Sequence, residues 1–169
     1  MKYKFLIAIL LIMISLEVFS QKDSLRISRN LIYLEAAGAG GYGSVNYEKV
    51  LFGKKNLMFA LRLGLGSYHI MDYTNKFNPD ILIPLFVNAY YGKNHKIELG
   101  AGQIVANIAH VGYTDDKPTR TTNFHTGLSI GYRYQKNTGG IFSRYAYTPI
   151  IEFNKTFRHW VGVSFGYSF

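Results

Sequence analysis

The sequence predicts an all-β protein, an eight-stranded antiparallel up-and-down transmembrane β-barrel, and three observations support this fold class. Residues 161–169 alternate large apolar side chains with Gly or Ser and end on the aromatic Phe169. Residues 1–20 have the pattern of an export signal. Between these ends, alternating or apolar segments recur, separated in turn by short polar turns and longer polar loops, as in membrane barrels.

The N-terminal residues predict export from the cytoplasm. Lys2 and Lys4 precede an apolar run, and Ser20 is a small residue before Gln21. At about ten residues the run is too short to cross a bilayer as a helix. A retained anchor and a buried strand are the alternatives. We predict a signal peptide over residues 1–20, an N-terminal periplasmic segment over 21–29 and a membrane barrel over 30–169.

The composition excludes several classes of site. The chain has no Cys, which removes disulfides, thiolate metal sites and Cys nucleophiles. Its formal net charge is +9, but the basic residues are scattered along an exported chain, so we expect no nucleic acid partner. An anionic lipid surface fits this charge better. No apolar segment of about twenty residues follows the signal, so any membrane span must be made by strands.

Strand counting starts from three short turns, at residues 52–56, 92–95 and 135–140, and three longer polar stretches, at 67–80, 109–122 and 152–158. The segments between them are predicted strands. They are residues 44–51, 57–66, 82–91, 96–107, 123–134, 141–150 and 160–169.

An eighth strand follows from parity. Both ends of an exported barrel of this kind should lie on the periplasmic side, which requires an even number of crossings. Residues 30–37 supply the missing strand, with 38–43 as a tight external turn. The alternative is one long strand kinked at those glycines.

Placing the apolar face of each strand outward predicts the interior, because successive side chains alternate between faces. The inward charged residues are then balanced in sign, three acidic and three basic: Glu35, Glu48, Glu98, Arg62, Arg133 and Arg144. A narrow eight-stranded interior has room only for side chains, so we predict a packed polar core and not a water-filled pore. The alternative is that some of these residues are solvated at the rims.

Three residues fit this pattern poorly. Gln103 would face lipid unless a bulge intervenes. Lys49 points outward and is tolerable at the periplasmic rim. Pro84 removes a ladder donor inside a predicted strand, which predicts a later strand start or a bulge.

Four features together carry a resemblance to a known family: the signal ending at Ser20, the repeated alternating strands, residues 131–135 before a Gly-containing turn, and the ending 164–169. On these features the chain resembles the small eight-stranded outer-membrane β-barrel proteins of Gram-negative bacteria. The resemblance implies the cell outer membrane as location. It implies outer-membrane lipids, including lipopolysaccharide, as surroundings. It also implies that the barrel-assembly machinery recognises Phe165, Tyr167 and Phe169. We expect a monomer.

These features predict an integral outer-membrane barrel with a structural or surface-interaction role and no enzymatic activity. One alternative is a lipid A-modifying deacylase or acyltransferase, with a Ser and a His within hydrogen-bond reach; its candidate residues are His69, His110, His125, Ser67, Ser129 and Ser143. Another is a soluble periplasmic ligand-binding β-barrel.

Other ligand signals are weak. Asp115 and Asp116 are an unspecific cation signal, and the basic loop residues Lys117, Arg120, Lys155 and Arg158 are candidates for lipid phosphates. We find no motif for a cofactor or metal ion.

Overall fold

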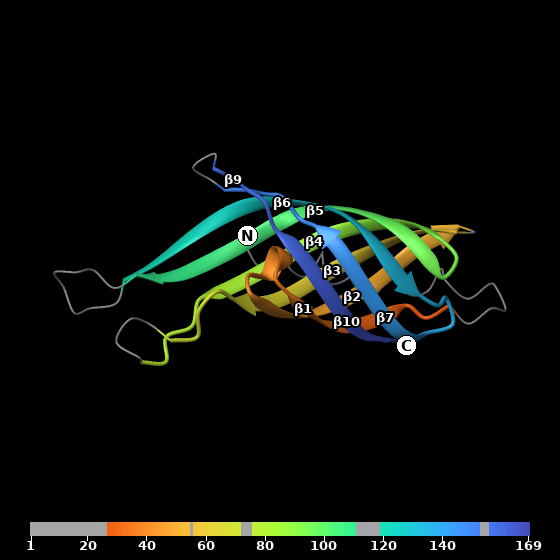
Figure 1. Cartoon of the computed structure of the whole chain (residues 1–169), viewed down its shortest axis with the longest axis horizontal. Coiled ribbons are helices and arrows are strands. Elements are labelled where there is room, and N and C mark those ends of the chain that lie inside the picture. The colour runs from red at the N-terminus through yellow and green to blue at the C-terminus, as the bar shows by residue number, and fades with distance from the viewer. Residues whose placement is uncertain (1–26, 55, 72–75, 111–118, 153–155) are drawn as a thin grey trace, which may run out of the picture.

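Eight long strands close into a barrel in the computed structural model, which describes residues 27–54, 56–71, 76–110, 119–152 and 156–169 (Figure 1). The strands are β1 (Asn30–Ala36), β2 (Gly43–Lys54), β3 (Leu57–Ser67), β4 (Ile81–Gly92), β5 (His95–His110), β6 (Thr119–Gln135), β7 (Gly140–Tyr147) and β10 (Val161–Ser168). Each pairs antiparallel with two neighbours, and β10 pairs with both β7 and β1, so the sheet has no open side. The predicted fold class is confirmed.

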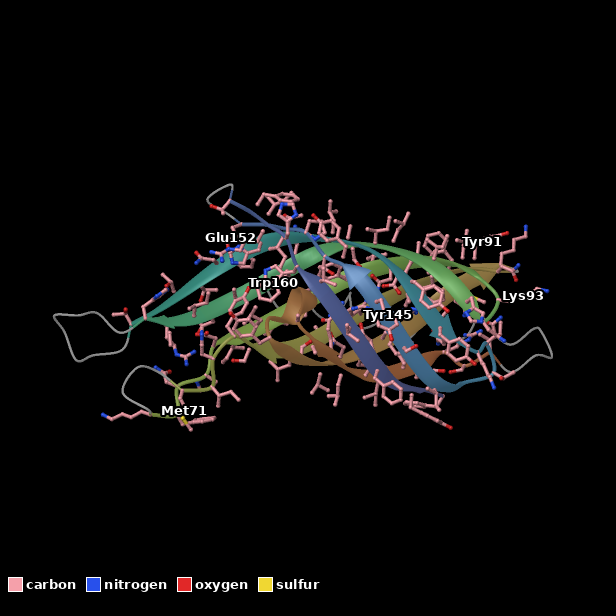
Figure 2. All side chains as sticks on the ribbon, viewed as in Figure 1. Met71, Tyr91, Lys93, Tyr145, Glu152 and Trp160 are labelled. Carbon is pink, nitrogen blue, oxygen red and sulfur yellow. The ribbon has the colours of Figure 1, made fainter. Side chains whose placement is uncertain are left out.

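The barrel has two different ends. At the turn end lie the short connections after β2, β4 and β6 together with the C-terminus, where Asn30 and Phe169 exchange backbone hydrogen bonds of 2.9 and 2.8 Å. At the loop end lie the C-terminal ends of β1, β3, β5 and β8. Tyr91 and Lys93 mark the turn end in Figure 2, and Met71 and Glu152 lie toward the loop end. Residues 1–26, which include the predicted signal peptide, lie outside the described residues.

No helix in the described part of the chain is long and apolar enough to cross a membrane.

The first hairpin consists of two strands, so the alternative of one kinked strand is wrong. Between β1 and β2 the chain forms the short 3-10 helix η2 (Gly38–Gly40), which is buried. Gly38 and Gly41 have φ values of +86° and +85°, a region that only glycine adopts without strain. The connection folds inward, where the Ala39 methyl group joins an apolar cluster at the loop end.

The predicted strand over residues 141–150 is interrupted. Strand β7 ends at Tyr147, and Thr148 and Pro149 separate it from β8 (Ile150–Ile151), which pairs with β6 and with β9 (Phe157–Arg158). The break is local, since β8 continues the register of β7: Tyr147 lies opposite Ile130, and Ile150 opposite Gly127. Pro149 lacks an N–H and cannot continue the ladder. The β8–β9 hairpin reaches Arg158, so strand structure extends into the stretch 152–158 that the sequence predicts as a loop.

Neither Pro84 nor Gln103 is accompanied by a bulge or, for Pro84, by a later strand start. Strand β4 begins before Pro84 and keeps its register with β5 throughout; only the pairing with β3 is interrupted, between Leu63 opposite Leu85 and Gly66 opposite Leu82. Gln103 stays in register and faces outward, where its Nε2 donates to Thr126 Oγ1 at 3.1 Å. Farther along the same face, Asn107 Nδ2 donates to Thr122 Oγ1 at 2.8 Å, so polar groups pair across these strands without a bulge. Lys49 lies opposite Asn30, at the turn end as expected.

The barrel is apolar outside and mixed inside. Large side chains such as Leu34, Ile97 and Phe165 point outward and are 64 to 66% exposed. The interior is only partly polar, which corrects the expectation of a polar core. An apolar cluster fills the loop end, with Leu82, Phe86, Ile104, Ala106 and Ile150 as members, and Trp160 and Tyr68 pack against it. Two smaller clusters lie toward the turn end: Val50, Met58, Ala60 and Tyr90, and Leu31, Tyr33 and Phe142.

A charge on the outward face of β6 should impair membrane insertion. We expect Leu128→Arg to lower folding stability in bilayers by about 2–4 kcal/mol, because the guanidinium must enter hydrocarbon. Phe124→Arg, on the same face but four residues nearer the loop end, is the control and should cost about 0–1 kcal/mol. Urea titration in lipid vesicles measures both; equal effects would contradict the apolar outer band.

Candidate functional site

Six charged side chains occupy the middle of the barrel interior. They come from six strands: Glu35 on β1, Glu48 on β2, Arg62 on β3, Glu98 on β5, Arg133 on β6 and Arg144 on β7. Each is at most 2% exposed. All of them are at inward positions of the alternation, so the structure brings together the whole predicted set.

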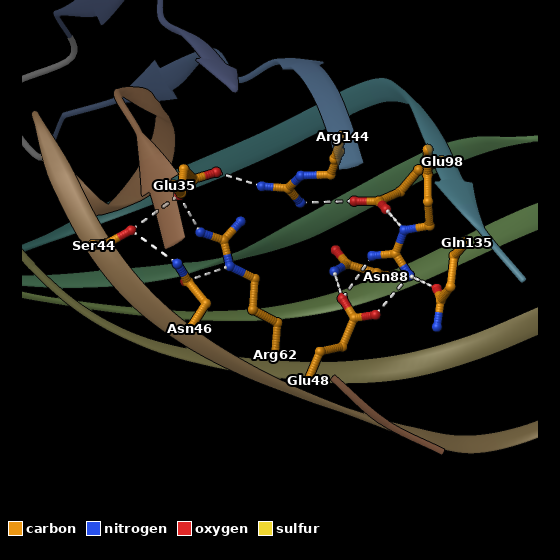
Figure 3. A network of polar contacts seen from close by, with 10 residues as sticks. Glu35, Ser44, Asn46, Glu48, Arg62, Asn88, Glu98, Gln135 and Arg144 are labelled. Atoms are coloured by element: carbon orange, nitrogen blue, oxygen red, sulfur yellow. Dashed lines mark hydrogen bonds and ion pairs between the residues drawn. The ribbon is translucent and has the colours of Figure 1, made fainter. Parts of the chain in front are cut away.

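These residues form one continuous series of ion pairs with alternating sign (Figure 3). Glu35 pairs with both Arg62 and Arg144. Arg144 Nη1 lies 2.9 Å from Glu98 Oε1, and Glu98 Oε2 lies 2.6 Å from Arg133 Nε. Arg133 Nη1 then lies 2.7 Å from Glu48 Oε1. The series balances three positive and three negative charges, which is what burial of this many ions requires.

The last pair crosses the whole barrel. Glu48 is on β2 and Arg133 on β6, which are four strands apart around the closed sheet. Two hydrogen bonds, of 2.7 and 2.9 Å, join the guanidinium to the two carboxylate oxygens. This two-bond geometry fixes both side chains and joins opposite walls.

Neutral polar groups complete the network. Asn88 Nδ2 donates to Glu48 at 2.7 Å, and Arg62 Nε donates to Asn46 Oδ1 at 2.9 Å. Asn46 in turn donates to Ser44 Oγ, whose hydroxyl donates to Glu35 at 3.3 Å. The alternation of side chains along each strand predicts that these residues point inward, but it does not predict which groups they bond.

Aromatic rings against the guanidinium groups are the part that sequence reasoning missed. The Arg133 guanidinium carbon lies 4.2 Å from the ring centre of Tyr90 and 5.0 Å from that of Phe142. Arg62 and Arg144 both lie over Tyr33, at 5.5 and 5.4 Å. Such contacts stabilise a desolvated cation by about 2 kcal/mol. The signal was available, because these rings occupy inward positions on their strands.

The Ser and His candidates do not form a catalytic pair. In the described part of the chain no Ser hydroxyl hydrogen-bonds a His ring. His69 Nδ1 lies 3.2 Å from Asp80 Oδ2, but Ser67 Oγ donates to the backbone oxygen of His69. His125 Nδ1 and Ser129 Oγ, both buried on the inner face of β6, have no hydrogen-bond partner. His110 is exposed at the end of β5, and Ser143 is on the outer face of β7.

The remaining predicted sites are dispersed. Four of them lie outside the described residues: Asp115, Asp116, Lys117 and Lys155. Among the described residues, no group of three or more potential metal ligands occurs. Arg158 Nε lies 2.5 Å from Glu152 at the loop end.

Arg120 donates to Asn107, Asn78 and the backbone oxygen of Pro79. It therefore fastens the segment before β4 to the β5–β6 hairpin. The expected assembly residues Phe165, Tyr167 and Phe169 run from the middle of β10 to the C-terminus, face outward and are 64, 59 and 55% exposed.

An aromatic group covers the inner cluster at the loop end. The Trp160 ring centre lies 5.6 Å from that of Tyr42 and 5.8 Å from that of Tyr68, which are themselves 5.9 Å apart. Burial raises the pKa of the Tyr68 hydroxyl, and the nearby Glu152 carboxylate adds to the rise.

The closed barrel and its interior can be compared with solved structures. The N-terminal β-barrel domain of Pseudomonas aeruginosa OprF is similar over 85% of this chain and 98% of that chain, with a TM-score of 0.60 and 16% sequence identity. The chain has the fold of the small outer-membrane β-barrels. Neisserial surface protein A also matches this small-barrel chain, over 83% of its length and 92% of that protein, with 12% identity and a TM-score of 0.44. No protein family model and no curated protein matches the sequence of this small barrel.

Removing a central cation should be costly. Arg144→Met leaves Glu35 and Glu98 each short of one buried partner, so we expect the free energy of unfolding to fall by about 3–5 kcal/mol. Arg158→Met removes the half-exposed pair at the loop end and should change stability by at most about 1 kcal/mol. Urea unfolding in detergent micelles measures both variants. A small effect of Arg144→Met would mean that the network does not hold the barrel together.

Proposed function

We propose that the protein is an integral outer-membrane β-barrel with a structural or surface-interaction role, and that its interior is plugged and not a wide pore. One observation carries the proposal: the outer wall is apolar, whereas six charges pair with one another inside. This is the reverse of a water-soluble barrel. A soluble ligand-holding barrel requires an apolar cavity inside and polar residues outside, so we do not retain that alternative.

The distribution of polar aromatic side chains supports a membrane setting. On the outer wall near the turn end, the Tyr47 hydroxyl donates to Asn30 at 2.8 Å, and Tyr132 contacts His95. On the outer wall near the loop end, the Tyr147 hydroxyl lies 2.6 Å from His159 Nδ1. Such rings suit the two membrane boundaries, where one edge is in hydrocarbon and the hydroxyl stays among polar groups.

The six charged side chains of the network are almost completely buried from solvent, which supports a plugged interior. Eight strands enclose a space that side chains can fill. The ion pairs occupy its middle, and the apolar clusters lie toward both ends. A permeating solute would have to break ion pairs and also pass through packed apolar side chains. We therefore assign the barrel no transport role.

The proposal extends to location and partners. We propose residence in the cell outer membrane as a monomer, surrounded by outer-membrane lipids that include lipopolysaccharide. We also propose that the barrel-assembly machinery recognises the outward aromatic residues Phe165, Tyr167 and Phe169. No arrangement of the described Ser and His residues favours the enzyme alternative, and we propose no catalytic activity.

Cell fractionation tests the location. We expect the protein in the outer-membrane fraction, and we expect faster migration on denaturing gels without heating, because a closed barrel stays folded in detergent until it is boiled. Recovery in the soluble periplasmic fraction would contradict the proposal.

Ion conductance tests the plugged interior. The wild-type protein should give no stable open channel in planar bilayers. Arg133→Gly removes the side chain that joins opposite walls, admits water, and should raise ion conductance; Arg158→Gly, outside the network, should not. Large, steady conductance by the wild type would refute the plug. Only protein that migrates as folded on an unheated gel is used.

A further inference from the structure

A hollow of about 780 Å³ interrupts the outer wall near the loop end. Its floor is a row of small outward residues on adjacent strands: Ala36 on β1 lies opposite Gly43 on β2, which lies opposite Ser67 on β3. A Cβ atom added to Gly43 would meet no atom within 4 Å. The hollow is therefore open where a side chain of the wall would normally stand.

Apolar side chains form the sides of this hollow. Toward the turn end, Leu34, Val45 and Leu65 make the next row across the same three strands. Val163 and Phe165 on β10 line one flank, and Ile81 on β4 lines the other. The volume of this open hollow is within the range of small-molecule sites, about 300–1,000 Å³.

The rim of the hollow at the loop end is polar. Tyr42 is 62% exposed there, and Ser67 Oγ donates to the backbone oxygen of His69 and can still accept a hydrogen bond. The His69 side chain is 71% exposed and contacts Asp80, which is itself buried. Arg120 does not line the hollow, but its guanidinium donates to the backbone oxygen of Pro79, which does, at 2.8 Å.

An apolar hollow that ends at hydrogen-bonding groups and a cation matches an amphiphile with an acidic head. We propose that it binds one acyl chain of an anionic membrane lipid, with the phosphate of the head group near Arg120 and the rim. The proposal rests on the proposed function, which sets this wall against the bilayer. Over most of the rest of the wall, large outward side chains leave an acyl chain only one face to contact. In the hollow the chain contacts residues on three sides, so it gains more van der Waals contact with the protein than it would on a flat wall.

Native mass spectrometry of the full chain, purified in mild detergent and mixed with phosphatidylglycerol, tests this site. We expect one retained lipid on the wild type. Gly43→Leu fills the hollow at a backbone conformation that any residue adopts, and Ala36→Leu fills it from the neighbouring strand. Each should lower lipid occupancy about tenfold. Ala101→Leu, an outward position on β5 away from the hollow, is the matched control and should leave the occupancy unchanged.

The head group is tested with phosphatidylcholine of the same chain length. Wild type should prefer phosphatidylglycerol, and Arg120→Gln should remove that preference. Equal occupancy in the wild type and both filling variants would overturn the site. A protein dimer that the filling variants abolish would also overturn it, by assigning the hollow to a second copy of the chain. Neither outcome would alter outer-membrane fractionation or migration on unheated gels, so failure here is distinguishable from failure of the proposed function.

Discussion

The burial of six paired charges is the constraint on which the rest of the barrel depends. Each unpaired ion would cost several kcal/mol, so the network is favourable only when it is complete. Its members come from β1, β2, β3, β5, β6 and β7, and Arg133 and Glu48 join opposite walls. The pairs therefore require all these strands to be in register at once. A shift of one residue in any of them would turn its charge toward the outer wall. Closure of the sheet and formation of the network are thus mutually dependent.

The surroundings of the network make its pairs stronger. Apolar clusters toward both ends keep water away from the ion pairs, and exclusion of water strengthens electrostatic attraction. Aromatic rings cover faces of the guanidinium groups that hydrogen bonds do not use. Inward glycines provide space: a Cβ on Gly64 would lie 2.3 Å from Asn46 Oδ1, and one on Gly100 would lie 2.4 Å from Asn88 Oδ1. Small residues and long charged residues inside the barrel are therefore parts of one arrangement.

The outer wall follows a different rule. It is uniform in character across the middle of the barrel, because hydrocarbon requires only that side chains be apolar. Departures from this uniformity carry information about function. One departure is the polar pairs on the outer face of β5 and β6, Gln103 with Thr126 and Asn107 with Thr122. The hollow over Ala36, Gly43 and Ser67 is the other departure, and it lies beside the aromatic group around Trp160 through Tyr42.

By itself, the sequence determined the fold class, the eight strands, the two faces of each strand and the identity of the inward charges. It could do so because alternation along a strand is a local property that reads directly from residue order. The tertiary structure decided which charges meet, since Arg144 and Glu35 are 109 residues apart and their contact depends on strand register and barrel width. The tertiary structure also decided where the strands depart from what the sequence pattern of a single strand predicts. Pro84 costs a few ladder pairs without a bulge, Thr148 and Pro149 interrupt a strand without shifting its register, and Gln103 faces outward beside Thr126. These outcomes depend on what the neighbouring strand supplies, and alternation within one strand contains no information about its neighbour.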